Sequence, residues 1–193
     1  ETKKHVTVAL NGDGGDELFA GYERYQAMLL SQAIPDFARK PISYLSQFLP
    51  DSSYAKNSLR RLKRFLAAFS LPVQKRYLKW AGIFDEGLKK NIYSDGFSKL
   101  VVGADPLKYV APFLSCPNSA SLIDSLLLTD TMTYLPYDLL VKVDIATMAN
   151  SLEARSPFLD HKLIEFAASL PSQYKMKKLI KKYLLKKAIK NLV

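Results

Sequence analysis

The chain has 193 residues, of which 48% are hydrophobic and 11% aromatic, enough to bury the core of one ordinary domain and to exclude a disordered chain. A single cysteine, Cys116, excludes an internal disulfide, two histidines are too few for a histidine-based metal site, and no apolar run approaches a membrane span. These features favour a cytoplasmic protein.

The net charge of +10 is concentrated in two zones. Residues 172–193 contain eight lysines and no acid, and residues 56–79 contain eight lysines or arginines and no acid. Such zones can bind nucleic acid or acidic membranes, or they can form the solvated face of amphipathic helices. Because no nucleic-acid motif accompanies the charge, we expect neither nucleic acid nor a membrane as a partner.

The stretch from residue 6 to residue 25, VTVALNGDGGDELFAGYERY, is the most informative part of the chain. The β-branched run at 6–10 predicts a buried strand, and the three glycines at 11–15 predict a tight turn. Asp16 suits a helix N-cap and Glu17 suits the first helical turn. We therefore expect a strand, a glycine turn and a helix from 16 to about 30.

The predicted turn carries three carboxylates, those of Asp13, Asp16 and Glu17. Glycine-rich turns often hold phosphate on backbone N–H groups, and a magnesium ion would offset the repulsion between phosphate and carboxylates. Turns also prefer glycine and aspartate for purely conformational reasons. The residues alone leave both interpretations open.

The rest of the chain is predicted to be almost entirely helical, with at most one or two short strands, one of them within residues 5–11. Pro35 and Pro41 divide the region after the first helix into short pieces. Longer helices are predicted over 57–69, 72–80, 85–92, 105–114 and 120–133.

A second informative stretch, YLPYDLLVKVDIATMANSLEARSPFLDHKLIEFAASLP, covers residues 134–171. Pro136 can begin its first helix, Ser156-Pro157 forces an extended turn, and Asp160 can cap a second helix that Pro171 ends.

Four charged residues interrupt this apolar pattern: Lys142, Asp144, Glu153 and Arg155. They can form the polar wall of a substrate cleft. Alternatively, Glu153, Arg155 and Asp144 can form a buried ion-pair network that holds two helices and a turn together.

The two stretches together resemble a known family. NGDGGDELFAGYERY is similar to the SGDGGDELFGGY segment of glutamine-dependent asparagine synthetases, and LPYDLLVKVDIATMANSLEARSPFLD is similar to their LPDDLLVKVDRASMAHSLEVRVPFLD segment. The lysine-rich KKYLLKKAI sequence follows in the same order. Residues 31–119 match the family in helical character only.

The resemblance implies that residues 1–193 are the C-terminal portion of a synthetase domain. This part would be mostly α: the helical half of an α/β nucleotide-binding domain of the PP-loop pyrophosphatase (adenine nucleotide alpha hydrolase-like) type, with one short edge strand. The glutaminase domain, the SGGxDS phosphate loop and a downstream lysine would lie outside it, so we expect no activity from the chain alone. We also expect self-association, such as a homodimer, through an exposed face around Val6, Val8, Leu18 and Phe19.

The same resemblance implies synthesis of asparagine, in which ATP and Mg²⁺ activate aspartate as β-aspartyl-AMP and ammonia from glutamine displaces AMP. Asn11 and Gly12 would bind ATP, Asp13 would take part in forming the acyl-adenylate, and Asp16 would bind the metal. Further residues of the cleft would be Glu17, Lys142 and Asp144.

Several positions depart from the quoted family segments, among them residues 11, 20 and 145. Asn11 replaces serine, Ile145 replaces arginine, and Ala20 replaces a glycine, a change that we expect a helix to tolerate. Rival functions are a related amide-forming ligase, such as a β-lactam synthetase-like enzyme or an amidotransferase for a cell-surface sugar or peptide, and a basic helical module that binds nucleic acid or protein. The β-lactam synthetases carry tyrosine at the position of Asp13, which favours an asparagine-synthetase-like site.

Overall fold

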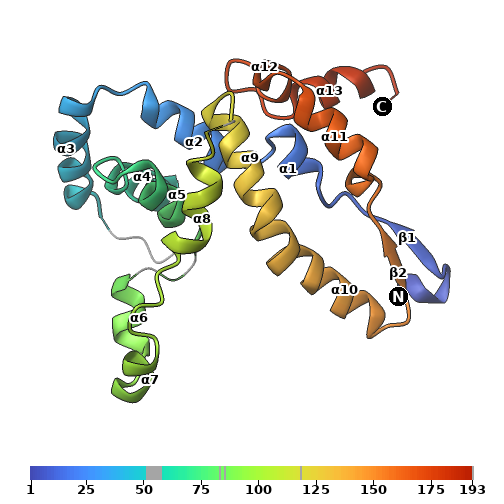
Figure 1. Cartoon of the computed structure of the whole chain (residues 1–193), viewed down its shortest axis with the longest axis horizontal. Coiled ribbons are helices and arrows are strands. Elements are labelled where there is room, and N and C mark those ends of the chain that lie inside the picture. The colour runs from blue at the N-terminus through green and yellow to red at the C-terminus, as the bar shows by residue number, and fades with distance from the viewer. Residues whose placement is uncertain (51–57, 83, 85, 118, 193) are drawn as a thin grey trace. The chain divides into compact units, whose positions relative to one another are not determined.

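The computed structural model describes residues 1–50, 58–82, 84, 86–117 and 119–192 (Figure 1). The chain divides into two units: unit 1 contains Glu1–Gln26 and Pro112–Val193, and unit 2 contains Ala27–Ala111. Helices dominate the described residues of both units, which confirms the mainly α prediction. No described helix has the length and apolar character that a membrane crossing requires.

Unit 1 holds both informative stretches of the sequence. Its elements are the 3-10 turn η1 (Thr2–Lys4), β1 (Val8–Leu10), α1 (Gly15–Phe19), the beginning of α2 (Glu23–Gln32), the end of α8 (Leu107–Leu114), α9 (Leu122–Met132), the π-helical turn η3 (Leu135–Leu140), α10 (Val141–Met148), β2 (Glu153–Arg155), the 3-10 turn η4 (Pro157–Leu159), α11 (His161–Ser169), α12 (Ser172–Lys175) and α13 (Tyr183–Ile189).

The two described strands pair in parallel, with Val8 opposite Glu153, Ala9 opposite Ala154 and Leu10 opposite Arg155. β1 confirms the strand predicted within residues 5–11, but the prediction that this strand is buried is wrong, because Val8 and Leu10 are 37% and 74% exposed. β2 was not predicted as a strand, because a three-residue segment with charges at both ends has little apolar pattern. The pairing brings the two informative stretches side by side, as Figure 1 shows.

The single helix predicted from 16 to about 30 is wrong, because the structure has two helices there. Gly14, with φ +88°, is the N-cap of α1, so the prediction of Asp16 as a cap is also wrong, and Asp16 lies in the first turn. α1 ends at Phe19, and its C-cap is Ala20, which has φ +55°. The prediction that Ala20 lies within a helix is wrong. The residue occupies a left-handed cap position, which glycine adopts with less strain.

The apolar side of α1 packs inside unit 1. Leu18 and Phe19 are only 5% exposed and form a cluster with Ala167 of α11. The prediction that Leu18 and Phe19 belong to an exposed face is therefore wrong, whereas Val6 and Val8 are 44% and 37% exposed.

The carboxylate of Asp130, which is completely buried in α9, links α9 to the beginning of α2. Arg24 approaches it with Nη2 at 2.8 Å and Nε at 3.1 Å, and the hydroxyl of Tyr25 donates to the same oxygen, Oδ2. The Arg24 guanidinium also lies 3.9 Å from the Tyr22 ring centroid and 4.9 Å from that of Tyr134. Burial, with Asp130 as the next cause, raises the pKa of Tyr25 well above its usual value, so the phenol stays a donor.

We predict that Asp130→Ala destabilises unit 1 by about 3 kcal/mol, because it leaves the largely buried Arg24 cation without its carboxylate. Urea denaturation followed by circular dichroism measures the change. Asp138→Ala, at an exposed acid on η3, is the control and is expected to change stability by less than about 0.5 kcal/mol. Equal stability of the two variants would contradict a central role for Asp130.

Unit 2 is helical in its described residues. Its elements are the remainder of α2, α3 (Asp36–Leu45), η2 (Ser46–Phe48), α4 (Ser58–Ala67), α5 (Val73–Ala81), α6 (Glu86–Ile92), α7 (Asp95–Leu100) and most of α8. The helix starts predicted at residues 57 and 85 lie outside the described residues, and α7 was not predicted.

The interpretation that the cations of the basic zone at residues 56–79 form a solvated helix face is wrong for Arg76, which is 1% exposed. Its guanidinium donates to the carbonyls of Ala68, Phe69 and Leu71 and to Ser31 Oγ at 2.8 Å. Arg76 thus satisfies the carbonyls that follow α4, a group of acceptors that a buried helix end must otherwise leave unpaired.

Candidate functional site

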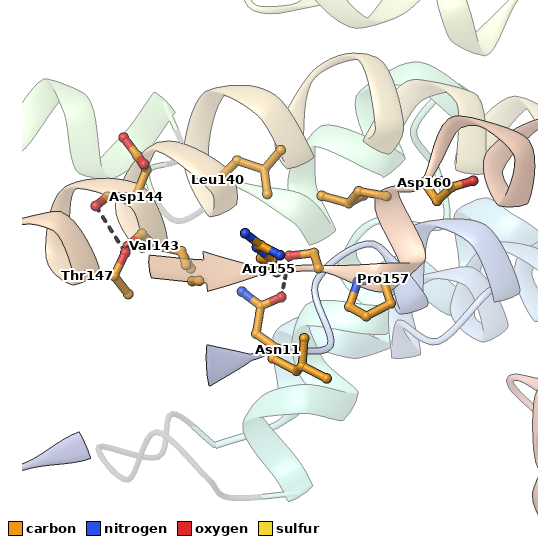
Figure 2. A pocket seen from close by; sticks show the side chains of 12 residues that line it. Asn11, Leu140, Val143, Asp144, Thr147, Arg155, Pro157 and Asp160 are labelled. Atoms are coloured by element: carbon orange, nitrogen blue, oxygen red, sulfur yellow. Dashed lines mark hydrogen bonds between the residues drawn. The ribbon is translucent and has the colours of Figure 1, made fainter. Parts of the chain in front are cut away.

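The candidate site begins where the paired strands of unit 1 end. The backbone N–H of Asn11, directly after β1, donates to the carbonyl of Arg155 at 2.9 Å. The hydroxyl of Ser156, directly after β2, donates to Asn11 Oδ1. One side chain of the first motif thus contacts the second motif across 145 residues of sequence (Figure 2).

The Asn11 side chain also organises the glycine turn. Its Nδ2 donates to Asp13 Oδ2 at 2.9 Å, and its Oδ1 accepts the Asp13 N–H at 3.4 Å. Gly12 is exposed and has no atom within 4 Å of a Cβ built on it, whereas a Cβ on Gly14 would lie 2.3 Å from Leu159. The glycine that sterics require in this turn is therefore Gly14, and Gly12 leaves the backbone open to an approaching ligand.

A cavity of about 560 Å³ lies beside Asn11, between the strand ends and α10. One wall is formed by Leu140 of η3 and by Val143 and Thr147 of α10. Arg155 of β2 also lines the cavity (Figure 2). Of the predicted site residues, Asn11 and Asp144 line this cavity. The lining therefore combines apolar side chains with polar groups that can orient a ligand.

The ion pair predicted between Glu153 and Arg155 exists, with Arg155 Nε 2.7 Å from Glu153 Oε1. The prediction that it is buried is wrong, since the two side chains are 53% and 63% exposed. Asp144 lies on the cavity wall, where its carbonyl accepts from Thr147 Oγ1 at 3.2 Å.

Lys142 and Glu17 do not line the Asn11 cavity. Lys142 is exposed on α10, and Glu17 is 1% exposed inside unit 1. Neither side chain joins Asn11 and Asp144 in the described structure, so a role for Lys142 or Glu17 in the cleft stays a prediction.

Asp16 is paired with a residue that the sequence patterns did not indicate. Lys182 Nζ, at the beginning of α13, lies 3.1 Å from Asp16 Oδ2, and the Lys182 N–H donates to the Phe19 carbonyl at 3.0 Å. Both side chains pass over Gly21, where a Cβ would lie 1.7 Å from Asp16 Oδ1 and 2.4 Å from Lys182 Cε. The KKYLLKKAI sequence was the available signal, but it did not tell which lysine would face Asp16.

We predict that Gly21→Ala separates the Asp16–Lys182 pair while changing stability by less than about 1 kcal/mol, because both clashing atoms belong to side chains that can turn away. The expected result is faster acylation of the Lys182 amine, read by mass spectrometry with exposed Lys190 as the internal reference. Gly12→Ala is the matched control, since nothing lies near its Cβ. Unchanged Lys182 reactivity in Gly21→Ala would contradict the close packing at residue 21.

The two oxygens of the Glu17 carboxylate differ in their hydrogen bonding. Oε1 accepts from the Tyr22 hydroxyl at 2.5 Å, and among the described residues no group donates to the buried Oε2. Burial raises the pKa of Glu17 above its ordinary value of 4.5, although the Tyr22 hydrogen bond opposes this shift. An ionised Glu17 is therefore costly in the folded state.

Because a raised pKa means that the folded state binds the Glu17 proton more tightly than the unfolded state, this group lowers stability as pH rises from 4.5 through the folded-state pKa. We predict that Glu17→Gln stabilises the chain at pH 7 by about 1 kcal/mol and removes this part of the pH dependence. The midpoints of urea denaturation at several pH values measure the change in stability and its pH dependence. The opposite result, a loss of stability at pH 7, would show that the charge of Glu17 is needed.

The residues around Asp16 can hold a metal only in part. Within the described ranges, no group of three or more His, Cys, Asp or Glu side chains is arranged to bind a metal ion. Mg²⁺ does not require such a group, because it commonly binds one or two carboxylates together with substrate phosphates and water. A single carboxylate, that of Asp16, fits this mode.

Comparison with known proteins shows the family to which the chain belongs. The family model described as asparagine synthase matches residues 1–193, the whole chain. The chain belongs to the asparagine synthase family. No solved structure was found to match it.

Two relatives agree with this family assignment over the full chain. Asparagine synthetase [glutamine-hydrolyzing] 1 of Bacillus subtilis (strain 168) is 36% identical over 196 residues, and an asparagine synthetase-type relative from Mycobacterium bovis is 33% identical over 196 residues. A third relative, Amidase chyE of Penicillium rubens, is 26% identical over 219 residues, which include 96% of the chain. The chain spans only 29%, 28% and 30% of these relatives' own lengths.

Proposed function

We propose that this chain is the C-terminal portion of the synthetase domain of a glutamine-hydrolysing asparagine synthetase. In the full-length parent protein, ATP would activate the side chain of aspartate as β-aspartyl-AMP, and ammonia from glutamine would displace AMP. The parent would carry the glutaminase domain and the phosphate loop, and the fold of the complete domain would be of the PP-loop pyrophosphatase type. A cytoplasmic location, a homodimer and inactivity of the chain alone stay predictions of this proposal.

The observation that carries the proposal is the contact between the two motifs. Asn11 bonds to Asp13 in one motif and accepts from Ser156 of the other, and both Asn11 and Ser156 line the 560 Å³ cavity. The family match by itself does not say how the two motifs are arranged in space. The two motifs meet at the carboxyl ends of parallel strands, which is where α/β domains bind ligands.

Asn11 and Gly12 would contact ATP, because the amide can donate and accept and the exposed Gly12 backbone has no side chain in the way. Asp13, half-buried and oriented by the Asn11 amide, would lie nearer the reacting carboxylate and α-phosphate. Asp144 would form a polar point on the opposite wall of the cavity.

Mg²⁺, when bound, would neutralise charge that develops on the phosphate oxygens. Asp16 would provide its protein ligand beside the pyrophosphate of ATP. Lys182 places a positive charge next to Asp16, which suits a polyphosphate and keeps the carboxylate paired when no metal is bound. We therefore propose this lysine as a further residue of the site, beside those named from the sequence.

A second candidate is a related amide-processing or amide-forming enzyme with another acyl substrate. The observation in its favour is the relative described as an amidase, Amidase chyE, which matches nearly all of the chain at 26% identity. The two candidates share an acyl-activating site and differ in the carboxylate that enters it. Replacing aspartate by other carboxylates in an ATP–pyrophosphate exchange assay of the parent distinguishes them.

We predict that Asp16→Asn in the parent lowers aspartate-dependent ATP–pyrophosphate exchange about 100-fold and that raised Mg²⁺ partly restores it. Lys182→Met is the matched control, since it removes the same ion pair but no metal ligand. Raised Mg²⁺ is therefore not expected to restore the exchange rate of this variant. Asp13→Asn, which keeps an acceptor for Asn11, is expected to lower kcat with little change in the KM for ATP.

Glutamine hydrolysis by the parent is the internal control, because its nucleophile would lie in another domain. It is expected to survive in all three variants. Parental rates of exchange in both Asp13→Asn and Asp16→Asn would show that these carboxylates are structural and that the proposed site is wrong.

A further inference from the structure

The loop that delivers Lys182 to Asp16 has a strained backbone. Lys178 and Leu179 have φ values of +47° and +66°, and Lys182 has φ +52°. The Ile180 N–H donates to the Lys177 carbonyl at 2.8 Å and the Lys177 N–H donates to the Ile180 carbonyl at 3.2 Å. This is the pattern of a two-residue turn of type I′, which strongly prefers Asn-Gly at its centre and here contains Lys-Leu.

Strained residues persist only where the surroundings hold them. One side chain outside the loop does this directly: Gln26 of α2 donates from Nε2 to the Leu179 carbonyl at 2.6 Å. Gln26 is half-buried, and its neighbour Tyr25 is fixed by the buried Asp130 carboxylate, so the donor itself is held in place.

The strain has a structural consequence at the candidate site. Only three residues separate the Gln26-bonded carbonyl of Leu179 from α13, and within that span the Lys182 N–H donates to the Phe19 carbonyl and its Nζ reaches Asp16. We expect a relaxed turn at 178–179 to change the direction in which the chain enters α13 and to withdraw the amine from Asp16.

We propose that Gln26 is a positioning residue that locks the strained 178–179 turn and thereby holds the Lys182 amine against Asp16. Gln26 touches neither Asp16 nor Lys182 through any hydrogen bond found in the described structure; it acts through the backbone of the turn. Its effect on catalysis rests on the proposed function, whereas its effect on the turn does not.

The test uses the full-length parent with Gln26→Leu, which keeps similar size but cannot donate. Amide hydrogen exchange at Lys182 is expected to accelerate about tenfold, because the Phe19 bond opens more often. The KM for ATP in the exchange assay is expected to rise about fivefold, with a smaller change in kcat. Gln32→Leu, at an exposed position of the same helix, is the matched control and leaves both values unchanged.

A second background separates this mechanism from a general loss of packing. Lys178→Asn with Leu179→Gly installs the sequence that a type I′ turn prefers and keeps the carbonyl that Gln26 bonds. In this background Gln26→Leu is expected to accelerate exchange at Lys182 less than twofold, because the turn no longer needs the clamp.

Unchanged exchange at Lys182 in Gln26→Leu overturns the proposal, as does an equal acceleration in the two backgrounds. Faster exchange with an unchanged KM for ATP supports the positioning role of Gln26 and instead overturns the proposed role of the Lys182 charge in binding the polyphosphate of ATP. The two failures are therefore distinguishable.

Discussion

The buried carboxylate of Asp130 is the charge on which the arrangement of unit 1 depends. A carboxylate without exposure is tolerated only when it is paired and hydrogen-bonded, and Arg24 and Tyr25 supply both requirements. Because these two residues lie in the first turn of α2, the pairing fixes where α2 begins relative to α9. The Tyr22 hydroxyl, in turn, reaches back to Glu17 in α1.

Helix α1, which precedes this docked turn, is short and has positive φ at both of its caps. Between the docked first turn of α2 and the glycine turn after β1, the chain has room for five helical residues, closed by Gly14 at one end and Ala20 at the other, both with positive φ. The same reversal leaves Gly21 beneath the Asp16 carboxylate, and only a residue without a side chain leaves room there. Asp16 is thus placed by backbone geometry, and Lys182 completes it from the far end of the sequence.

The basic character of the chain also has a different meaning in the structure. Several cations serve as internal partners: Arg76 binds three carbonyls in unit 2, Lys175 is 3% exposed and lies 2.9 Å from Asp124, and Lys182 pairs with Asp16. Lysine and arginine can satisfy buried acceptors while their stems pack among apolar groups. The charge count therefore overstates the positive surface that remains for a partner.

The sequence by itself determined the helical class, the strand at Val8–Leu10, the cap at Asp160 and the family, because these follow from local periodicity, turn residues and long motifs. It indicated Asn11 and Asp144, which the structure brings to one cavity. Only the tertiary structure decided that Ala20 caps α1 and that Glu153–Arg155 is a strand with an exposed ion pair. It also decided that Glu17 is buried and that Lys182 faces Asp16. These features depend on contacts between residues far apart in the chain, and local propensity carries no information about such contacts.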